Sequence, residues 1–163
     1  MKRIFLAALC LFAAFLISCG ERSYEILPFE GKSVTASCLV NDKFSVVIDK
    51  RNERLSLSVL SPTEISGLEF LFSRDGDFII SENIKIPVQR SELSGIYALS
   101  SLFNIEEETM ISAVSRDGCG NITFKNQIGE YLLIFDKDGY VTDAKITGEE
   151  FCYDVKILSI KTE

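Results

Sequence analysis

Histidine and tryptophan are both missing from this chain, which also has only three prolines among its 163 residues. Without histidine, the chain lacks the side chain that most often acts as a general base near neutral pH. It also lacks a Gly-x-Ser-x-Gly elbow, a phosphate-binding glycine loop and any pair of metal-ligand motifs. These absences argue against an enzyme and predict neither a cofactor nor a metal site. A hydrolase that uses carboxylates alone is the only catalytic alternative left open.

Basic residues are also in the minority. The chain has 17 lysines and arginines against 24 aspartates and glutamates, which gives a net charge of −7 at pH 7. Removal of Lys2 and Arg3 with a cleaved leader would bring the side-chain charge to about −9. Because affinity for nucleic acids comes mainly from lysines and arginines that neutralise phosphates, this balance argues against nucleic acid as a partner.

Long apolar runs are absent except near the start of the sequence. The run over residues 4–17 has about 14 residues, fewer than the ~20 that a membrane-spanning helix needs. It follows Lys2 and Arg3 and ends in Leu16-Ile17-Ser18-Cys19. A cationic start, an apolar stretch and a small residue before the cleavage point are the parts of a secretory signal. A transmembrane helix, or a signal peptide with an incidental cysteine, is the alternative interpretation.

The segment from Leu16 to Cys19 resembles the lipobox of bacterial lipoproteins. In that family the cysteine thiol receives a diacylglyceryl group, the leader is cut before the cysteine, and the new amino terminus is often acylated as well. The resemblance implies a protein of the bacterial cell envelope that is held outside the cytoplasm by lipidated Cys19, without spanning the membrane. The membrane is then one partner, and the sequence leaves open whether it is the inner or the outer one.

Three parts are predicted along the chain: a lipoprotein signal peptide over residues 1–18, a lipidated N-terminus and tether over residues 19–31, and a single β-rich domain over residues 32–163. The domain contains Cys38, Cys119 and Cys152. This odd number allows one disulfide and one free thiol, or three reduced thiols that behave as small hydrophobic side chains. No two of them have CxxC spacing, which again argues against a metal site.

Apolar and polar residues alternate from residue 32 onward, as is typical of an antiparallel sheet built from hairpins. The alternation predicts strands over residues 34–40, 44–48, 55–59, 68–72, 78–80, 110–114, 121–124, 131–135, 140–146 and 151–160. One segment has helical spacing instead and predicts a helix with Ser91 as its N-cap and an end near Phe103. The predicted fold class is α+β, mainly antiparallel β. We expect a curved sheet or half-barrel meander with one substantial helix packed on its concave face.

The stretch from Pro62 to Phe70, together with residues 129–135 and the Asp138-Gly139 hairpin, resembles the fold of bacterial lipoprotein-sorting and carrier proteins. That family has an incomplete antiparallel barrel closed by helices over an apolar cavity. The likeness extends over about residues 31–161. It implies a non-catalytic module that binds a lipid, an acyl chain or the lipidated end of another protein.

Two acidic segments are candidate cation sites. The sequence Asp136-Lys137-Asp138-Gly139 begins like a calcium loop, but its glycine is fourth instead of sixth, so that a hairpin turn is predicted. Residues Glu106-Glu107-Glu108 are expected to be solvated surface.

Large apolar side chains, including 12 phenylalanines, must be buried against something. They form either a closed core between sheet and helix or, in part, the lining of an apolar cavity, and both arrangements require the same alternation. The predicted lining is Leu57, Val59, Phe70, Phe72, Leu93, Tyr97, Phe124, Leu133 and Phe135. A cavity favours a lipid- or acyl-binding module, whereas a closed core favours a structural or interaction lipoprotein with an envelope protein as its partner.

Overall fold

One antiparallel sheet of 11 strands makes up most of the structure. The computed structural model describes residue 29 and residues 31–104, 110–116 and 119–163. In chain order the strands are β1 (Val34–Val40), β2 (Phe44–Arg51), β3 (Arg54–Ser61), β4 (Leu68–Ser73), β5 (Gly76–Ser81), β6 (Ile84–Val88), β7 (Met110–Arg116), β8 (Cys119–Lys125), β9 (Glu130–Phe135), β10 (Val141–Thr147) and β11 (Cys152–Thr162). Their order across the sheet is β6-β5-β4-β3-β2-β1-β11-β10-β9-β8-β7.

The sheet consists of two meanders, β1–β6 and β7–β11, that are joined by the pairing of β1 with β11. This pairing is antiparallel and extends from Val34 opposite Thr162 to Val40 opposite Val155. Beyond it, the amide of Ser33 donates to the carbonyl of Glu163 at 3.1 Å, and the amide of Glu163 donates back at 3.0 Å. Strands from the two ends of the described chain therefore lie side by side in the middle of the sheet.

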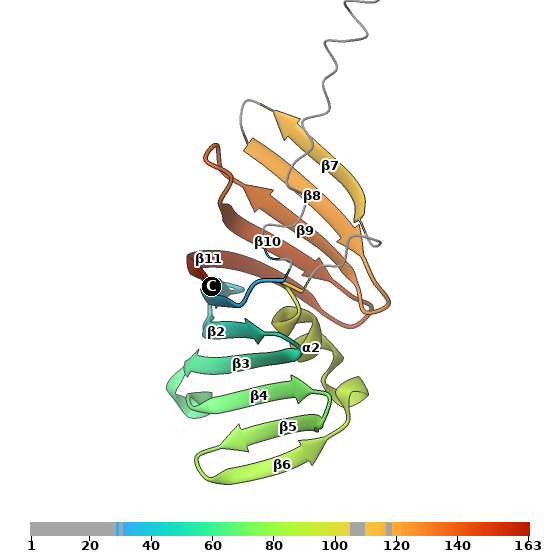
Figure 1. Ribbon diagram of the computed structural model, residues 1–163. Helices are drawn as coiled ribbons and strands as arrows, with labels where there is room; N and C mark the ends of the chain where they lie inside the picture. Colours follow the sequence, from blue (N-terminus) through green and yellow to red (C-terminus); the bar gives the residue numbers. More distant parts are fainter. Residues whose placement is uncertain (1–28, 30, 105–109, 117–118) are drawn as a thin grey trace, which may run out of the picture.

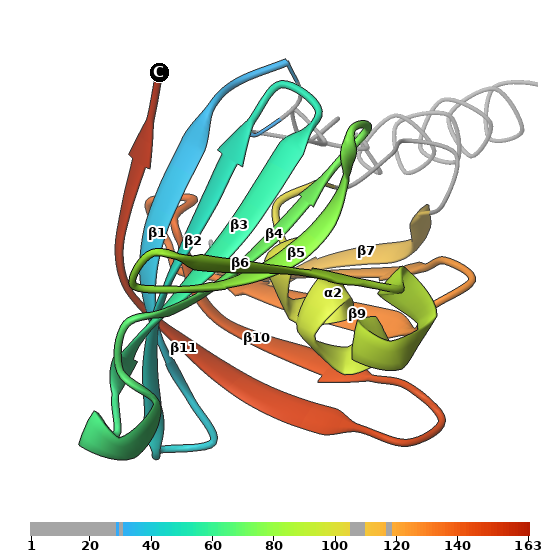
Figure 2. The ribbon, with the colours of Figure 1, turned by 90° about the horizontal axis from the view of Figure 1, so that it is seen from below.

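The helical segment connects β6 to β7 and lies on the concave side of the curved sheet (Figures 1 and 2). It begins as the 3-10 turn η2 (Arg90–Leu93) and continues as the α-helix α2 (Ser94–Ser100). A second 3-10 turn, η1 (Thr63–Ile65), connects β3 to β4. Helix α2 contacts β2 and β3, so that it covers the middle of the concave face.

Burial alternates along the strands and defines the concave face as the core. In β1, Val34, Ala36, Cys38 and Val40 are buried, and the residues between them are half-buried. The same face of the other strands adds to one hydrophobic cluster with Ala98, Leu99, Leu102 and Phe103 from α2 and the residues after it. Burial of a valine, leucine or phenylalanine side chain contributes about 1.5–3 kcal/mol, so this cluster is the main source of stability.

One lysine is buried beside this core. The Nζ atom of Lys50 donates hydrogen bonds to the carbonyl oxygens of Phe29, at 3.0 Å, and Phe103, at 3.3 Å. The rings of Phe29 and Phe103 also meet edge to face, with centroids 5.1 Å apart. Lys50 therefore links Phe29, in the segment before β1, to Phe103, in the segment after α2.

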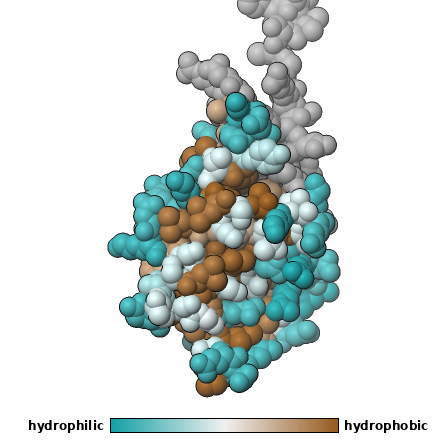
Figure 3. Space-filling view, turned by 90° about the vertical axis from the view of Figure 1, so that its left-hand side faces the viewer, coloured by the Kyte–Doolittle hydropathy of each residue, from teal (hydrophilic) through white to brown (hydrophobic). Residues whose placement is uncertain are grey.

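The convex face, on the side away from α2, is more polar but not uniformly so. Figure 3 shows apolar patches across the middle of this face, with hydrophilic side chains at its margins. A shallow groove of about 350 Å³ lies there, and Leu39, Leu132 and Ile134 are among its lining residues. The charged side chains along the groove are Asp42, Asp143, Lys145, Asp154 and Lys156. Because both signs are present, this groove has no evident charge preference.

The predicted fold class is confirmed, since a curved antiparallel sheet carries a helix on its concave face. The ten predicted strands all occur, but β6, which contains Pro87, was not predicted from the sequence. Proline is acceptable here because β6 lies at the edge of the sheet. The predicted start of the helix is wrong. Gln89, not Ser91, caps η2, and its side chain forms a reciprocal capping box with Glu92.

The hairpin predicted at residues 136–139 is confirmed. The Asp136 carboxylate accepts hydrogen bonds from the amides of Asp138 and Tyr140, both at 2.9 Å, and Gly139 has a φ of 85°. The Asp136 side chain therefore stabilises the turn. The described residues contain no group of three histidine, cysteine or acidic side chains that could hold a metal ion.

Several sequence predictions lie outside the described residues. They concern the signal peptide, lipidation of Cys19, the tether apart from residues 29 and 31, and the Glu106–Glu108 run. Within the described part of the chain, no helix is both long and apolar enough to cross a membrane.

Candidate functional site

A cleft of about 520 Å³ lies between the helical segment and the loop that joins β8 to β9. The helical side contributes Arg90, Ser91, Ser94, Tyr97, Ser101 and Asn104, and the β8–β9 side contributes Phe124, Asn126, Gln127 and Ile128. Apolar and aromatic surface is thus combined with hydroxyl and amide groups. Ligand-binding clefts of this size, typically about 300–1,000 Å³, have the same mixture.

The helix presents two different faces because of its period. Arg90, Ser94, Tyr97, Ser101 and Asn104 follow one another at intervals of three or four residues, and all line the cleft. The intervening residues Ala98, Leu99 and Leu102 are buried in the core. One face of this segment therefore anchors it to the sheet, and the other is available to line the cleft.

Buried hydrogen bonds fix the end of α2 to β9. The hydroxyl of Tyr131 lies 3.0 Å from the hydroxyl of Ser101 and donates to the carbonyl of Ala98 at 3.3 Å. The Tyr131 ring stacks on Phe124, with centroids 4.5 Å apart and an interplanar angle of 10°. Burial raises the pKa of Tyr131, so the hydroxyl stays protonated and can donate. The hydrogen bonds and the stacked rings together connect this wall of the cleft to β8 and β9.

The β8–β9 loop is shaped by its own asparagine. The Asn126 side-chain oxygen accepts hydrogen bonds from the amides of Ile128, at 2.9 Å, and Gly129, at 3.1 Å. Gly129 lies so close to the next hairpin that a Cβ atom there would be 2.6 Å from the carbonyl oxygen of Thr147. The loop, and with it Ile128, is therefore held close to the end of β10.

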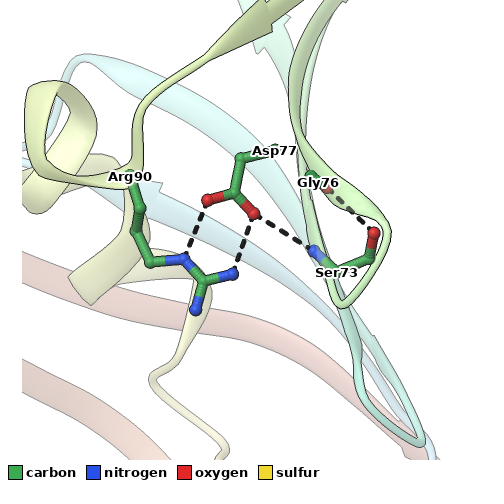
Figure 4. A network of polar contacts seen from close by, with 4 residues as sticks. All are labelled: Ser73, Gly76, Asp77 and Arg90. Atoms are coloured by element: carbon green, nitrogen blue, oxygen red, sulfur yellow. Dashed lines mark hydrogen bonds and ion pairs between the residues drawn. The ribbon is translucent and has the colours of Figure 1, made fainter.

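An ion pair (Figure 4) holds Arg90, which is one of the residues that line the cleft. Its Nε and Nη2 atoms donate to the two carboxylate oxygens of Asp77 in β5, at 2.9 and 2.8 Å. The Ser73 amide donates to the same carboxylate at 3.3 Å. The hydrogen bond from Arg90 is the main reason why the pKa of Asp77 is lowered, and Asp77 in turn raises the pKa of Arg90. Both side chains are therefore charged across the physiological range.

The nine residues predicted to line a cavity occupy different environments. Tyr97 and Phe124 line the cleft. Leu57, Val59 and Leu133 are buried in the core cluster, and Phe70 and Phe135 pack against it while partly buried. Phe72 is buried with its ring against that of Tyr97, at 5.1 Å between centroids, and Leu93 is half-buried at the end of η2. The structure thus places Tyr97 and Phe124 in the cleft, with Phe72 against the Tyr97 ring, and most of the other predicted lining residues in or against the core cluster.

Sequence reasoning missed the polar lining. The residues Arg90, Ser94, Ser101, Asn126 and Gln127 belong to the cleft, but the predicted lining contained only apolar and aromatic residues. The helical spacing of the serines was a usable signal for one wall. No local pattern indicated that the β8–β9 loop would face it, because that depends on the strand order.

A row of apolar residues crosses the concave face toward its free edge. Leu57 in β3 is opposite Phe70 in β4, which is opposite Ile79 in β5 and then Ile86 in β6. Exposure rises along this row from 1% at Leu57 to 50% at Ile86, and Ile84 is 63% exposed. Two isoleucines on one edge strand are thus left largely uncovered.

No protein-family model matches the chain, and a search of curated proteins found no match. Similar solved structures include an uncharacterized conserved protein from Thermus thermophilus, with a TM-score of 0.49, 8% identity and coverage of 85% of this chain and 83% of that one. A domain from Vibrio parahaemolyticus, provisionally assigned as an outer membrane lipoprotein-sorting protein, has a TM-score of 0.46, 9% identity and coverage of 85% and 88%. A LolA superfamily protein from Nitrosomonas europaea has a TM-score of 0.40, 11% identity and coverage of 84% and 88%. At these values the similarity carries no conclusion about ligand or partner.

Proposed function

We propose that this protein is a membrane-anchored lipoprotein of the bacterial cell envelope, outside the cytoplasm, and that its domain binds an apolar lipid or acyl ligand without catalysing a reaction. The observation that supports this most directly is the cleft of about 520 Å³ beside α2. Tyr97, Phe124 and Ile128 offer it apolar surface, and the serines and amides of the rim offer hydrogen bonds. A lipid or fatty acid has the same division between an apolar chain and a polar end.

The apolar row from Phe70 to Ile86, which is partly buried in β4 and β5 and half exposed in β6, gives the proposal a second support. Phe70, Ile79 and Ile86 lie beside one another in register, and Ile86 is half exposed. Each methylene of a ligand that is buried on such a surface contributes about 0.8 kcal/mol. The apolar side chains of the concave face could therefore retain an acyl chain without any new fold element.

The anchoring part of the proposal is based on the lipobox-like segment that ends in Cys19. Metabolic labelling with an alkyne fatty acid should label the wild-type chain in membranes, and Cys19→Ser should abolish both the label and membrane association. A labelled Cys19→Ser chain, or an unlabelled wild type with an intact N-terminus by mass spectrometry, would refute lipidation at this cysteine.

Ligand binding is tested on the acyl-free chain from Glu21 onward, purified without denaturant. Mass spectrometry of its organic extract should show lipid above the level of an unrelated control domain. Ile128→Ser in the cleft should lower the amount of bound lipid severalfold. Tyr140→Ser is the matched control, because Tyr140 is 65% exposed in the β9–β10 turn and does not line the cleft. A lipid-free protein that also takes up no added fatty acid or phospholipid would refute binding.

A second candidate function has an observation of its own. Leu57 and Leu133 are each only 1% exposed, so the middle of the concave face is closed core. This favours a structural or interaction lipoprotein with an envelope protein as its partner. Pull-down from membranes with the lipid-anchored chain as bait should then return one stoichiometric protein, and recovery of none would count against this alternative.

A further inference from the structure

We infer that the ligand of the cleft is an anionic amphiphile, with an apolar acyl part and an oxyanion head group that Arg90 binds. This inference rests on the proposed function and specifies the class of ligand. A neutral lipid, or an acyl chain buried without its head group, would make no use of the charge that the structure places there.

The charge of the cleft differs from that of the molecule. Among the described lining residues, Arg90 is the only charged one, and the others are hydroxyl, amide or apolar side chains. The whole chain has a net charge of −7. A protein of this composition would repel an anion over most of its surface, whereas the described lining of this cleft has a guanidinium and no carboxylate, which favours an anion.

The ion pair with Asp77 holds the Arg90 guanidinium in place without using all of its hydrogen-bond donors. Asp77 accepts hydrogen bonds from Nε and Nη2, and Figure 4 shows the third nitrogen directed away from Asp77. A guanidinium carries five N–H donors, so Asp77 leaves donors for a second acceptor. The Asp77 side chain is itself only 9% exposed and is not part of the cleft lining, so that its carboxylate does not occupy the site.

The ring of Tyr97 adds a second constraint on the guanidinium. The Arg90 Cζ atom lies 4.5 Å from the centroid of this ring, close enough for a cation–π interaction. With Asp77 at one edge and Tyr97 beneath one face, the arginine has little freedom left to lose when it binds a ligand. Hydrogen bonds from such a cation to an oxyanion are roughly twice as strong as neutral ones.

The neighbouring side chains fit the same ligand. Ser91 and Ser94 lie beside Arg90 along the helical segment and can donate to further oxygens of a head group. Phe124 and Ile128 supply apolar surface on the opposite wall. The cleft therefore has donors and a positive charge on one side, and apolar contact for a chain on the other.

The experiment compares two photo-crosslinkable probes that differ only in their head group, a dodecanoate and the corresponding dodecanol, each with a diazirine on the chain. They are added to the full-length protein reconstituted in zwitterionic phospholipid nanodiscs. Mass spectrometry then locates and quantifies the label by peptide. We expect the carboxylate probe to label the peptides that contain Tyr97 or Phe124–Ile128 at least ten times more than the alcohol.

Variants assign the effect to the arginine. Arg90→Gln should lower carboxylate labelling of the cleft about tenfold and leave alcohol labelling unchanged. Arg90→Lys keeps the charge and should lose less, so it serves if the glutamine variant does not fold. Arg74→Gln is the matched control, because Arg74 is 80% exposed, pairs with Glu53 and does not line the cleft, and this variant should retain the preference for the carboxylate.

Each outcome bears on a different statement. Equal labelling by the two probes would overturn the anionic ligand while leaving apolar binding intact. A carboxylate preference that survives in both Arg90 variants would overturn the role of Arg90. Cleft peptides that neither probe labels would contradict the proposed function of this cleft.

Discussion

Gly95 in α2 tests how closely the helix approaches the sheet. A Cβ atom at this position would lie 2.6 Å from the hydroxyl oxygen of Tyr153 and 3.3 Å from two ring atoms of Phe151. Contacts below about 3 Å force a displacement, and the Tyr153 ring is restrained because it stacks on Phe151 with centroids 5.5 Å apart. A methyl group at residue 95 therefore pushes α2 away from β11 or shifts both rings.

Two effects of Gly95→Ala oppose each other. Alanine is favoured over glycine in a helix by about 1 kcal/mol, whereas overpacking costs about 1–3 kcal/mol. We expect a net loss of up to about 2 kcal/mol in the free energy of unfolding. In a Tyr153→Phe background the hydroxyl is gone, and the same substitution should become neutral or stabilising by up to about 1 kcal/mol.

Urea denaturation of the wild type, the two single variants and the double variant measures this coupling. The expected interaction energy is about 1–3 kcal/mol, well above the few tenths expected of independent sites. If Gly95→Ala stabilises the protein equally in both backgrounds, α2 does not approach Tyr153 as described, and the placement of the cleft would be refuted with it.

Further predictions concern Lys50, Cys38 and Gly129. Lys50→Met should lower the free energy of unfolding by about 2–4 kcal/mol, because the carbonyl groups of Phe29 and Phe103 lose the hydrogen bonds that the charged lysine donates. An unchanged urea midpoint would contradict this. Burial raises the pKa of Cys38 to about 12, so a thiol reagent should modify it only after unfolding, while the two exposed cysteines react in the native state. In the unfolded chain the pKa of this thiol is about 9.0, so the unfolded state loses the proton first as the pH rises. The free energy of unfolding should therefore fall between pH 9 and 12, and it should fall less steeply in the Cys38→Val variant. Gly129→Ala should lower the free energy of unfolding by about 1–3 kcal/mol, because the nearby Thr147 oxygen is a backbone atom that cannot rotate away. Thermal unfolding measures this loss.

Strand positions were predictable because burial has a period of two along most of the sheet. Val34 to Val40 alternates in the sequence as it does in burial, and the hairpin at Asp136 carries its own turn chemistry. β6 was not predictable, because its isoleucines remain exposed and Pro87 is a strand breaker except at an edge. Alternation shows which residues face the core, but not that the core is closed there.

The cleft was only partly predictable for a different reason. Tyr97 was recognised through helical spacing, but the wall opposite it comes from the β8–β9 loop, and the strand order that places this loop near α2 depends on the pairing of β11 with β1. Asn126 carries no signal of that approach. Arg90 was missed because its role depends on Asp77, a residue of β5 that lies opposite Val88 in the sheet.

The pairing of β1 with β11 also determines how the molecule can fold. The turn after β1 contacts the start of β11 across 113 residues of sequence, through the Asn41 side-chain oxygen and the Asp154 amide. Contacts of such long range slow folding, because the entropy of closing a long loop is lost before the contact forms. Until then the β1–β6 meander has a second free edge at β1, where an incoming strand from another copy could pair. We therefore expect the protein to be most prone to aggregate before β11 has paired with β1.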